Sequence, residues 1–107
     1  MTIPEITVAQ LSERLAAGAT ALFDVRNPDE FDVERVPGAV LVPLLEVPER
    51  VSEFPTSGEV LVICKSGGRS AQAVDFLRER GVEAVNVAGG TMAWVSAGYP
   101  VESGGVS

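Results

Sequence analysis

The chain contains one cysteine, and the residue types around it could support nucleophilic chemistry. The segment consists of Cys64, Lys65, Ser66, Gly67, Gly68, Arg69 and Ser70. An apolar run at 59–63 precedes the cysteine and indicates a buried strand, and residues 71–81 have the pattern of a helix that ends at a glycine. Segment 64–70 is therefore predicted to be a loop between the end of a strand and the start of a helix.

Such a loop is suited to holding an anion. The first backbone N–H groups of a helix have no partner within the helix and carry partial positive charge. A loop that curls over them can point several of these groups at one spot. Gly67 and Gly68 allow this convergence because they lack a Cβ. A thiol at that spot is stabilised as the thiolate, so we predict that Cys64 is a nucleophile. Lys65 and Arg69 add positive charge.

The same cysteine has a second interpretation. A lone cysteine at the end of an apolar strand can be a small buried hydrophobic residue with no chemical role. The two glycines, the two cations and the predicted helix start favour a nucleophile at Cys64.

The chain has no histidine, and this restricts the chemistry further. Ser-His-Asp and Cys-His catalysis are excluded, as are histidine-ligated metal sites. A cysteine nucleophile must then rely on backbone amides and fixed cations, or attack a substrate whose leaving group needs little help from a proton. We expect neither a metal nor a cofactor.

The composition is that of one small acidic domain. A single domain over 1–107 is expected from the length, and one cysteine cannot form an internal disulfide. The net charge of −7 disfavours nucleic-acid binding. No signal peptide and no run of about 20 apolar residues is found, so we expect a cytoplasmic protein without a membrane segment. The sequence leaves the oligomeric state open.

Strands and helices alternate at short intervals along the chain. Strands are predicted at 20–25, 40–43, 59–63 and 84–87, and helices at 7–17, 28–35, 71–81 and 91–97, with an irregular helix at 44–53. This alternation predicts an α/β fold with a mostly parallel sheet and helices on both faces. Ligand sites in such folds lie at the carboxyl ends of the strands, here at 24–26, 64–70 and 88–90. Residues 99–107 are predicted to be a frayed tail.

Four separated pieces of the chain resemble the single-domain rhodanese family of sulfurtransferases. Segment 24–31 is similar to the family's D-V-R-x-x-x-E-[FY] pattern, 36–44 to I-P-G-A-x-x-x-P-L, 64–70 to C-x-x-G-x-R-S, and 89–94 to G-G-x-x-x-W. The pieces occur in the family's order and span about residues 5–100. The resemblance implies a three-layer rhodanese-like fold whose mostly parallel sheet has about five short strands.

The resemblance also implies an activity. Cys64 would accept a sulfane sulfur from an anionic donor such as thiosulfate, form a persulfide, and pass the sulfur to a small thiol, cyanide or a protein thiol. The substrate-binding residues would be Lys65, Ser66, Gly67, Gly68, Arg69 and Ser70. Arg69 would lie near the mouth of the pocket, whereas Lys65 is either solvated or attracts anions.

Other matched positions have supporting or structural roles under this resemblance. Asp24 and Arg26 either support the loop through hydrogen bonds and an ion pair, with Glu30 as a candidate partner, or are purely structural. Trp94 is expected to be core packing. The chain departs from the pattern at Glu34 and Arg35, where the family often has Gly-His, and this departure bears on donor preference and rate.

Two other functions compete with this interpretation. Cysteine phosphatases and arsenate reductases use similar loops, but those loops run one residue longer from cysteine to arginine than the six residues from Cys64 to Arg69. A shorter ring favours a bare sulfur over a tetrahedral oxyanion. A persulfide relay or sulfur-carrier module without its own small-molecule donor is the other alternative, because it could use the same site.

Overall fold

Five parallel strands form the centre of the molecule. The structure, a computed structural model, describes residues 2–18 and 20–105. The strands are β1 (Glu5–Ile6), β2 (Ala21–Asp24), β3 (Val40–Leu41), β4 (Glu59–Ile63) and β5 (Glu83–Val87). They are arranged in the order β1-β5-β4-β2-β3, and every neighbouring pair is parallel. The loops that follow β2, β4 and β5 therefore emerge at one edge of the sheet.

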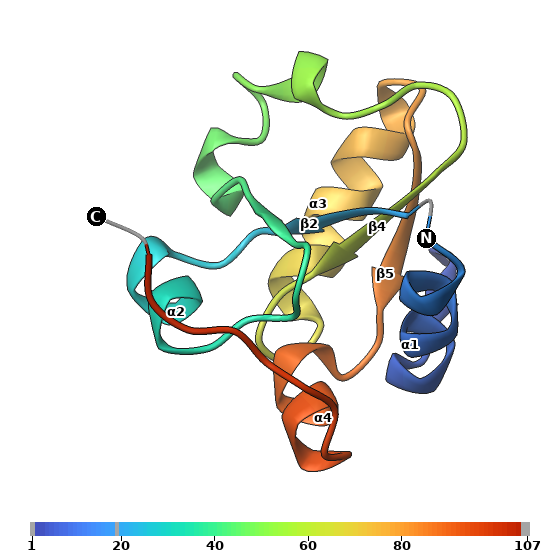
Figure 1. Cartoon of the computed structure of the whole chain (residues 1–107). Helices are drawn as coiled ribbons and strands as arrows, with labels where there is room; N and C mark the ends of the chain where they lie inside the picture. Colours follow the sequence, from blue (N-terminus) through green and yellow to red (C-terminus); the bar gives the residue numbers. More distant parts are fainter. Residues whose placement is uncertain (1, 19, 106–107) are drawn as a thin grey trace.

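Helices cover both faces of this sheet. The α-helices are α1 (Val8–Ala17), α2 (Pro28–Val33), α3 (Gly68–Glu79) and α4 (Gly90–Ser96), and two short 3-10 helices are η1 (Leu44–Glu46) and η2 (Val51–Glu53). Figure 1 shows α1 and α3 on either side of the central strands. The three-layer α/β architecture predicted from the sequence is confirmed. None of the helices within 2–18 and 20–105 is long and apolar enough to cross a membrane.

The side-chain alternation of β4 divides the core into two clusters. Val60 and Val62 pack in the cluster that contains the apolar side chains of α3, and Leu61 and Ile63 pack in the cluster that contains Trp94. Successive side chains of a strand point to opposite faces. Cys64, the residue after β4, continues this alternation and therefore lies on the α3 side of the sheet.

Several element boundaries differ from those predicted. Helix α3 begins at Gly68, before the predicted start at 71, because the glycine loop already turns into helical conformation. The irregular helix predicted at 44–53 is two separate 3-10 helices. Strand β1 was not predicted, because two residues are too few to show an alternation.

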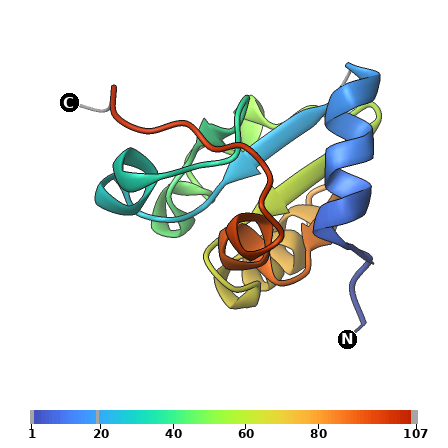
Figure 2. The same ribbon diagram turned by 60° about the horizontal axis from the view of Figure 1, so that its bottom comes forward.

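The segment after α4 is held by hydrogen bonds, whereas its composition predicted fraying. Trp94 Nε1 donates to Pro100 O at 2.7 Å. Arg35 and Glu102 exchange backbone hydrogen bonds of 2.9 and 3.0 Å, and Gly104 N donates to Asp32 O at 2.7 Å. Figures 1 and 2 show this segment crossing from α4 to α2. The last part of the predicted tail, 106–107, lies outside the described residues.

Candidate active site

The loop between β4 and α3 places its backbone around Cys64. Gly67 adopts a left-handed conformation with φ of 111° and is the N-cap of α3. This conformation is costly for a residue with a Cβ, so glycine suits the position. The turn brings the backbone N–H of Gly67 to 3.1 Å from Cys64 Sγ. Gly67 is buried, whereas Ser66 and Gly68 are exposed.

The Cys64 sulfur is buried but is surrounded by hydrogen-bond donors. Its side chain is 1% exposed. Burial raises the pKa of the thiol, but the Ser70 hydroxyl and the backbone N–H groups of Ser70, Gly67 and Ser66 outweigh this and lower the pKa below its usual range. The donors point at the sulfur from the glycine-bearing loop and the first turn of α3. An inert cysteine under apolar groups would lack these contacts, so the geometry favours a thiolate.

Ser70 links the sulfur to a polar network that sequence reasoning missed. Its Oγ lies 3.2 Å from Cys64 Sγ and 2.5 Å from Asn86 Oδ1 in β5. A hydroxyl has one proton, so Ser70 donates to only one of these acceptors at a time. Asn86 Nδ2 in turn donates to Glu5 Oε2 at 2.9 Å and to Gly67 O at 3.3 Å. The available signal was a polar residue, Asn86, among the buried apolar residues of β5.

The start of α4 braces the loop from its other side. Thr91 N and Thr91 Oγ1 donate to Cys64 O at 2.8 and 3.0 Å, and Met92 N donates to Lys65 O at 2.9 Å. Gly90 allows this approach, because a Cβ there would lie 2.6 Å from Cys64 O. The sequence placed 88–90 at the site but gave no indication of Thr91 or Met92.

Asp24 and Arg26 form a buried ion pair at the end of β2. The Nη2 of Arg26 lies 2.8 Å from Asp24 Oδ2, and the two side chains are 4% and 0% exposed. Arg26 Nη2 also donates to Glu34 O at 2.9 Å, just after α2. Arg26 does not pair with the Glu30 carboxylate, although the sequence had suggested this partner, and contacts only the Glu30 carbonyl at 3.5 Å. The pair connects β2 to the end of α2.

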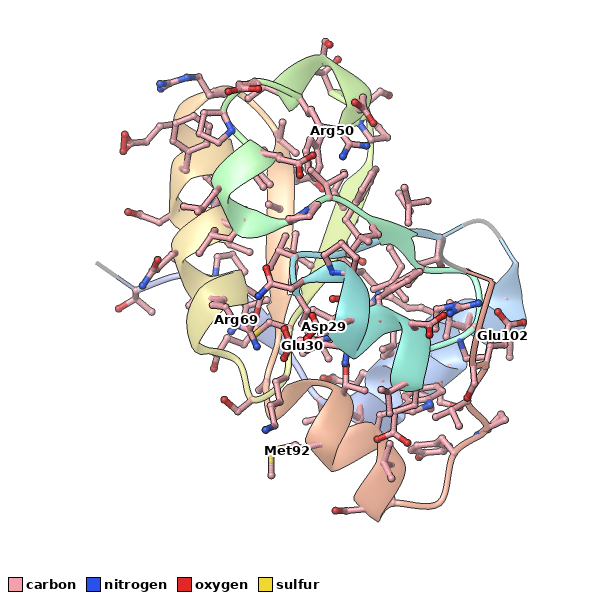
Figure 3. All side chains as sticks on the ribbon, turned by 90° about the vertical axis from the view of Figure 1, so that its left-hand side faces the viewer. Asp29, Glu30, Arg50, Arg69, Met92 and Glu102 are labelled. Carbon is pink, nitrogen blue, oxygen red and sulfur yellow. The ribbon has the colours of Figure 1, made fainter. Side chains whose placement is uncertain are left out.

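Arg69 pairs with Glu30 across the site. Its Nη1 and Nη2 donate to Glu30 Oε1 and Oε2 at 2.7 and 2.9 Å. Figure 3 shows the two side chains meeting, Arg69 from the start of α3 and Glu30 from α2. The hydrogen bond from Arg69 is the main cause that lowers the pKa of Glu30 to about 2. Lys65, by contrast, is exposed and forms no ion pair with any other described residue.

Two grooves adjoin the loop. One of about 220 Å³ is lined by Arg26, Glu30, Val33, Glu34, Lys65, Thr91 and Met92. Another of about 380 Å³ is lined by Val25, Asn27, Pro28, Pro43, Leu44, Leu45, Glu46 and Arg69. The Glu30–Arg69 pair therefore contributes one residue to each groove. A larger hollow of about 520 Å³, near α1 and Trp94, contains no residue of the site. Over 2–18 and 20–105, no three His, Cys, Asp or Glu side chains gather into a metal site.

Comparisons with known proteins point to one family. The model of the family described as "Rhodanese-like domain" matches residues 7–97. A sulfurtransferase from Allochromatium vinosum is 38% identical, covering 92% of this chain and 94% of that protein. The putative sulfurtransferase YtwF from Bacillus subtilis is also 38% identical, covering 88% of this chain and 92% of that protein.

Solved structures show the same likeness. A rhodanese-related protein from Thermoplasma volcanium superposes with a TM-score of 0.86 at 34% identity, covering 92% of this chain and 97% of that one. A rhodanese-like domain protein from Staphylococcus aureus superposes with a TM-score of 0.87 at 30% identity, covering 96% of this chain and 100% of that one.

Proposed function

The chain belongs to the family of rhodanese-like domains, and on that premise we propose that it transfers sulfane sulfur through a persulfide on Cys64. The proposal rests on the hydrogen-bond contacts of the Cys64 sulfur. The only thiol of the chain is held by hydrogen-bond donors from Gly67 N and Ser70 Oγ, so it is stabilised as the thiolate that attacks sulfur. The proposed donor is an anion such as thiosulfate, and the proposed acceptor is a thiol or cyanide.

The two half-reactions need no acid–base side chain. The Cys64 thiolate attacks the outer sulfur of thiosulfate, a new S–S bond forms, and the old S–S bond breaks as sulfite leaves with the electron pair. An acceptor thiolate or cyanide then attacks the terminal sulfur of the persulfide, and the Cys64 thiolate leaves. Both leaving groups depart as stable anions, so the lack of histidine is no obstacle. The same N–H groups stabilise the negative charge before and after transfer.

A persulfide relay is the second candidate. One relative, the putative sulfur carrier protein YrkF from Bacillus subtilis, is 33% identical over 87% of this chain and 51% of that protein. A relay would use the same Cys64 persulfide but receive its sulfur from a protein. A phosphatase or arsenate reductase is less suited, because the loop from Cys64 to Arg69 is short and its donors already meet at the sulfur.

Intact-mass measurement tests the proposal directly. Thiosulfate should add one sulfur, about 32 Da, to the protein, and a small thiol should remove it. Cys64→Ala should abolish both the adduct and any formation of thiocyanate from cyanide. A persulfide that forms only from a protein donor would support the relay. Hydrolysis of p-nitrophenyl phosphate with no sulfur adduct would overturn sulfur transfer in favour of a phosphatase. A cytoplasmic location stays a prediction.

A further inference from the structure

The cations at the mouth of the site differ in whether they are already paired. Arg26 already forms a buried ion pair with Asp24. Arg69 is committed to Glu30 through two hydrogen bonds of 2.7 and 2.9 Å. Lys65 alone extends from the loop without an ion-pair partner in the described parts of the chain. An incoming anion therefore meets one free positive charge, although the sequence supplies three.

Hydrogen bonds hold both the Glu30 carboxylate and the helix that carries it. Its Oε1 accepts a hydrogen bond from Asn27 N at 3.0 Å, which completes the capping box of α2. The other end of α2 is tied down by the hydrogen bond from Arg26 to Glu34 O. Because Glu30 is held at the first turn of an anchored helix, it keeps the Arg69 guanidinium turned toward itself. Glu30 also remains ionised throughout the neutral range, since its pKa is about 2.

We propose that Glu30 is a positioning residue that sets donor specificity by keeping Arg69 occupied. With Arg69 neutralised, the site favours sulfur donors that carry little charge, such as organic persulfides, over the doubly charged thiosulfate. The inference rests on the proposed sulfur transfer and deepens it. Coulomb interaction scales with charge, so the Glu30 carboxylate repels a dianion about twice as strongly as a monoanion at the same distance. A free guanidinium would instead offer paired N–H donors to the oxygens of thiosulfate.

The reaction with an organic persulfide balances in the same way as with thiosulfate. The Cys64 thiolate attacks the terminal sulfur of R–S–SH, the bond between the two donor sulfurs breaks, and R–S⁻ leaves with the electron pair. The terminal sulfur keeps its hydrogen, and no oxidant or reductant is consumed. The leaving thiolate carries a single charge on sulfur, whereas sulfite carries two negative charges on a larger group.

The test compares two donors on Glu30→Gln. Glutamine keeps the size of the side chain and an oxygen for Asn27 N and Arg69, but removes the charge. The donors are thiosulfate and the persulfide of 2-mercaptoethanol, which has no charge outside its sulfurs. We expect the KM for thiosulfate to fall at least about fivefold with kcat little changed, while the KM for the persulfide changes by less than about twofold.

Two controls show whether the effect passes through Arg69. Glu53→Gln removes the charge of a two-bond pair with Arg50, at 2.7 and 2.8 Å, that contains no residue of the loop, and should alter neither KM. Adding Arg69→Gln to Glu30→Gln should cancel the gain for thiosulfate. Equal shifts for both donors, or an unchanged KM for thiosulfate, would overturn the role of Glu30 and leave the sulfur transfer standing. Absence of any Cys64 adduct from either donor would overturn both.

Discussion

Two neighbouring strand-to-helix turns share one local geometry but make different contacts. The turn from β4 into α3 and the turn from β5 into α4 each have a left-handed glycine as N-cap, Gly67 with φ of 111° and Gly89 with φ of 80°. In the first turn, Gly67 N and Ser70 Oγ contact the Cys64 sulfur. In the second turn, the free N–H groups of α4 bind the carbonyls of Cys64 and Lys65.

The difference shows that a helix N-terminus becomes a site only where its donors are left for a ligand. Helix α4 begins, like α3, with N–H groups that have no partner within the helix, but it uses Thr91 N and Met92 N to brace the loop. One turn surrounds the Cys64 sulfur with hydrogen-bond donors, and the other holds the first turn in shape. The comparison predicts that substitutions in α4 act on the position of the loop, whereas substitutions in α3 act on the chemistry of the sulfur.

Gly90→Ala should have the largest effect of the substitutions that test this comparison. A Cβ at Gly90 would lie 2.6 Å from Cys64 O and equally close to the carbonyl of Lys65. The loop must therefore move away from α4. We expect a loss of about 2–4 kcal/mol in the free energy of unfolding, from overpacking and from the left-handed backbone together. Urea unfolding measures the loss, and intact mass after thiosulfate should show persulfide formation slowed at least about tenfold.

Gly98→Ala separates the close contact from the backbone cost. Gly98 also has a positive φ, 83°, but nothing lies within 4 Å of an added Cβ. Its substitution should cost about 1–2 kcal/mol from the backbone alone and leave persulfide formation intact. If Gly90→Ala and Gly98→Ala cost the same and both form the persulfide normally, α4 does not brace the loop in the way described.

Ser70→Ala should change the titration of the sulfur. The Ser70 hydroxyl is a donor that lowers the pKa of Cys64 against the opposing effect of burial, so its removal raises that pKa. The thiolate is then present only at higher pH, and the pH midpoint of alkylation by iodoacetamide moves upward. At any pH below that midpoint the alkylation rate should fall. Cys64 is the only thiol in the chain, so the label reports this site alone. A midpoint that stays in place or moves downward would contradict the role of Ser70.

The sequence was sufficient to predict the turn around the Cys64 sulfur, but not the contacts that hold this turn in place. The apolar run before Cys64 and the glycine pair after it predicted the strand, the loop and the helix. The pairing of Glu30 with Arg69 spans 39 positions and depends on the fold. The brace from Met92 uses a backbone N–H group, which every residue except proline has, and Thr91 uses such a group together with its hydroxyl. Of these contacts, only the one from the Thr91 hydroxyl depends on the residue type.

The hydrogen bonds of the segment after α4 differ from the predicted fraying for a related reason. Its glycines and serines suggested fraying, but backbone hydrogen bonds between Arg35 and Glu102 and from Gly104 N to Asp32 O hold it, together with the bond from Trp94 Nε1 to Pro100 O. Composition describes side chains, and the backbone contacts do not depend on them. Strand β1 pairs with β5 in the same way, and this pairing places Glu5 beside Asn86.

Thr91→Val should have a smaller effect, on stability and not on titration. The substitution removes the hydrogen bond from Thr91 Oγ1 to Cys64 O but keeps the one from Thr91 N, so the carbonyl retains a partner. We expect a loss of about 1 kcal/mol in the free energy of unfolding. The pH midpoint of iodoacetamide labelling should match that of the unmodified chain, because the hydroxyl does not contact the sulfur. A midpoint displaced as far as in Ser70→Ala would remove the distinction between the two turns.

Gly68→Ala should have the smallest effect, and its sign should be opposite to that of Gly67→Ala. Gly68 has no positive φ, and an added Cβ meets nothing within 4 Å. Alanine at this first position of α3 should therefore stabilise the fold by about 0.4–1 kcal/mol, through the lower entropy of its unfolded chain. At Gly67, whose φ is 111°, alanine should cost about 1–2 kcal/mol, although its nearest contact, Gly89 N, is a tolerable 3.6 Å away. Thermal unfolding of the two variants side by side measures both signs. Destabilisation by Gly68→Ala would mean that both glycines shape the loop and that α3 starts later than Gly68.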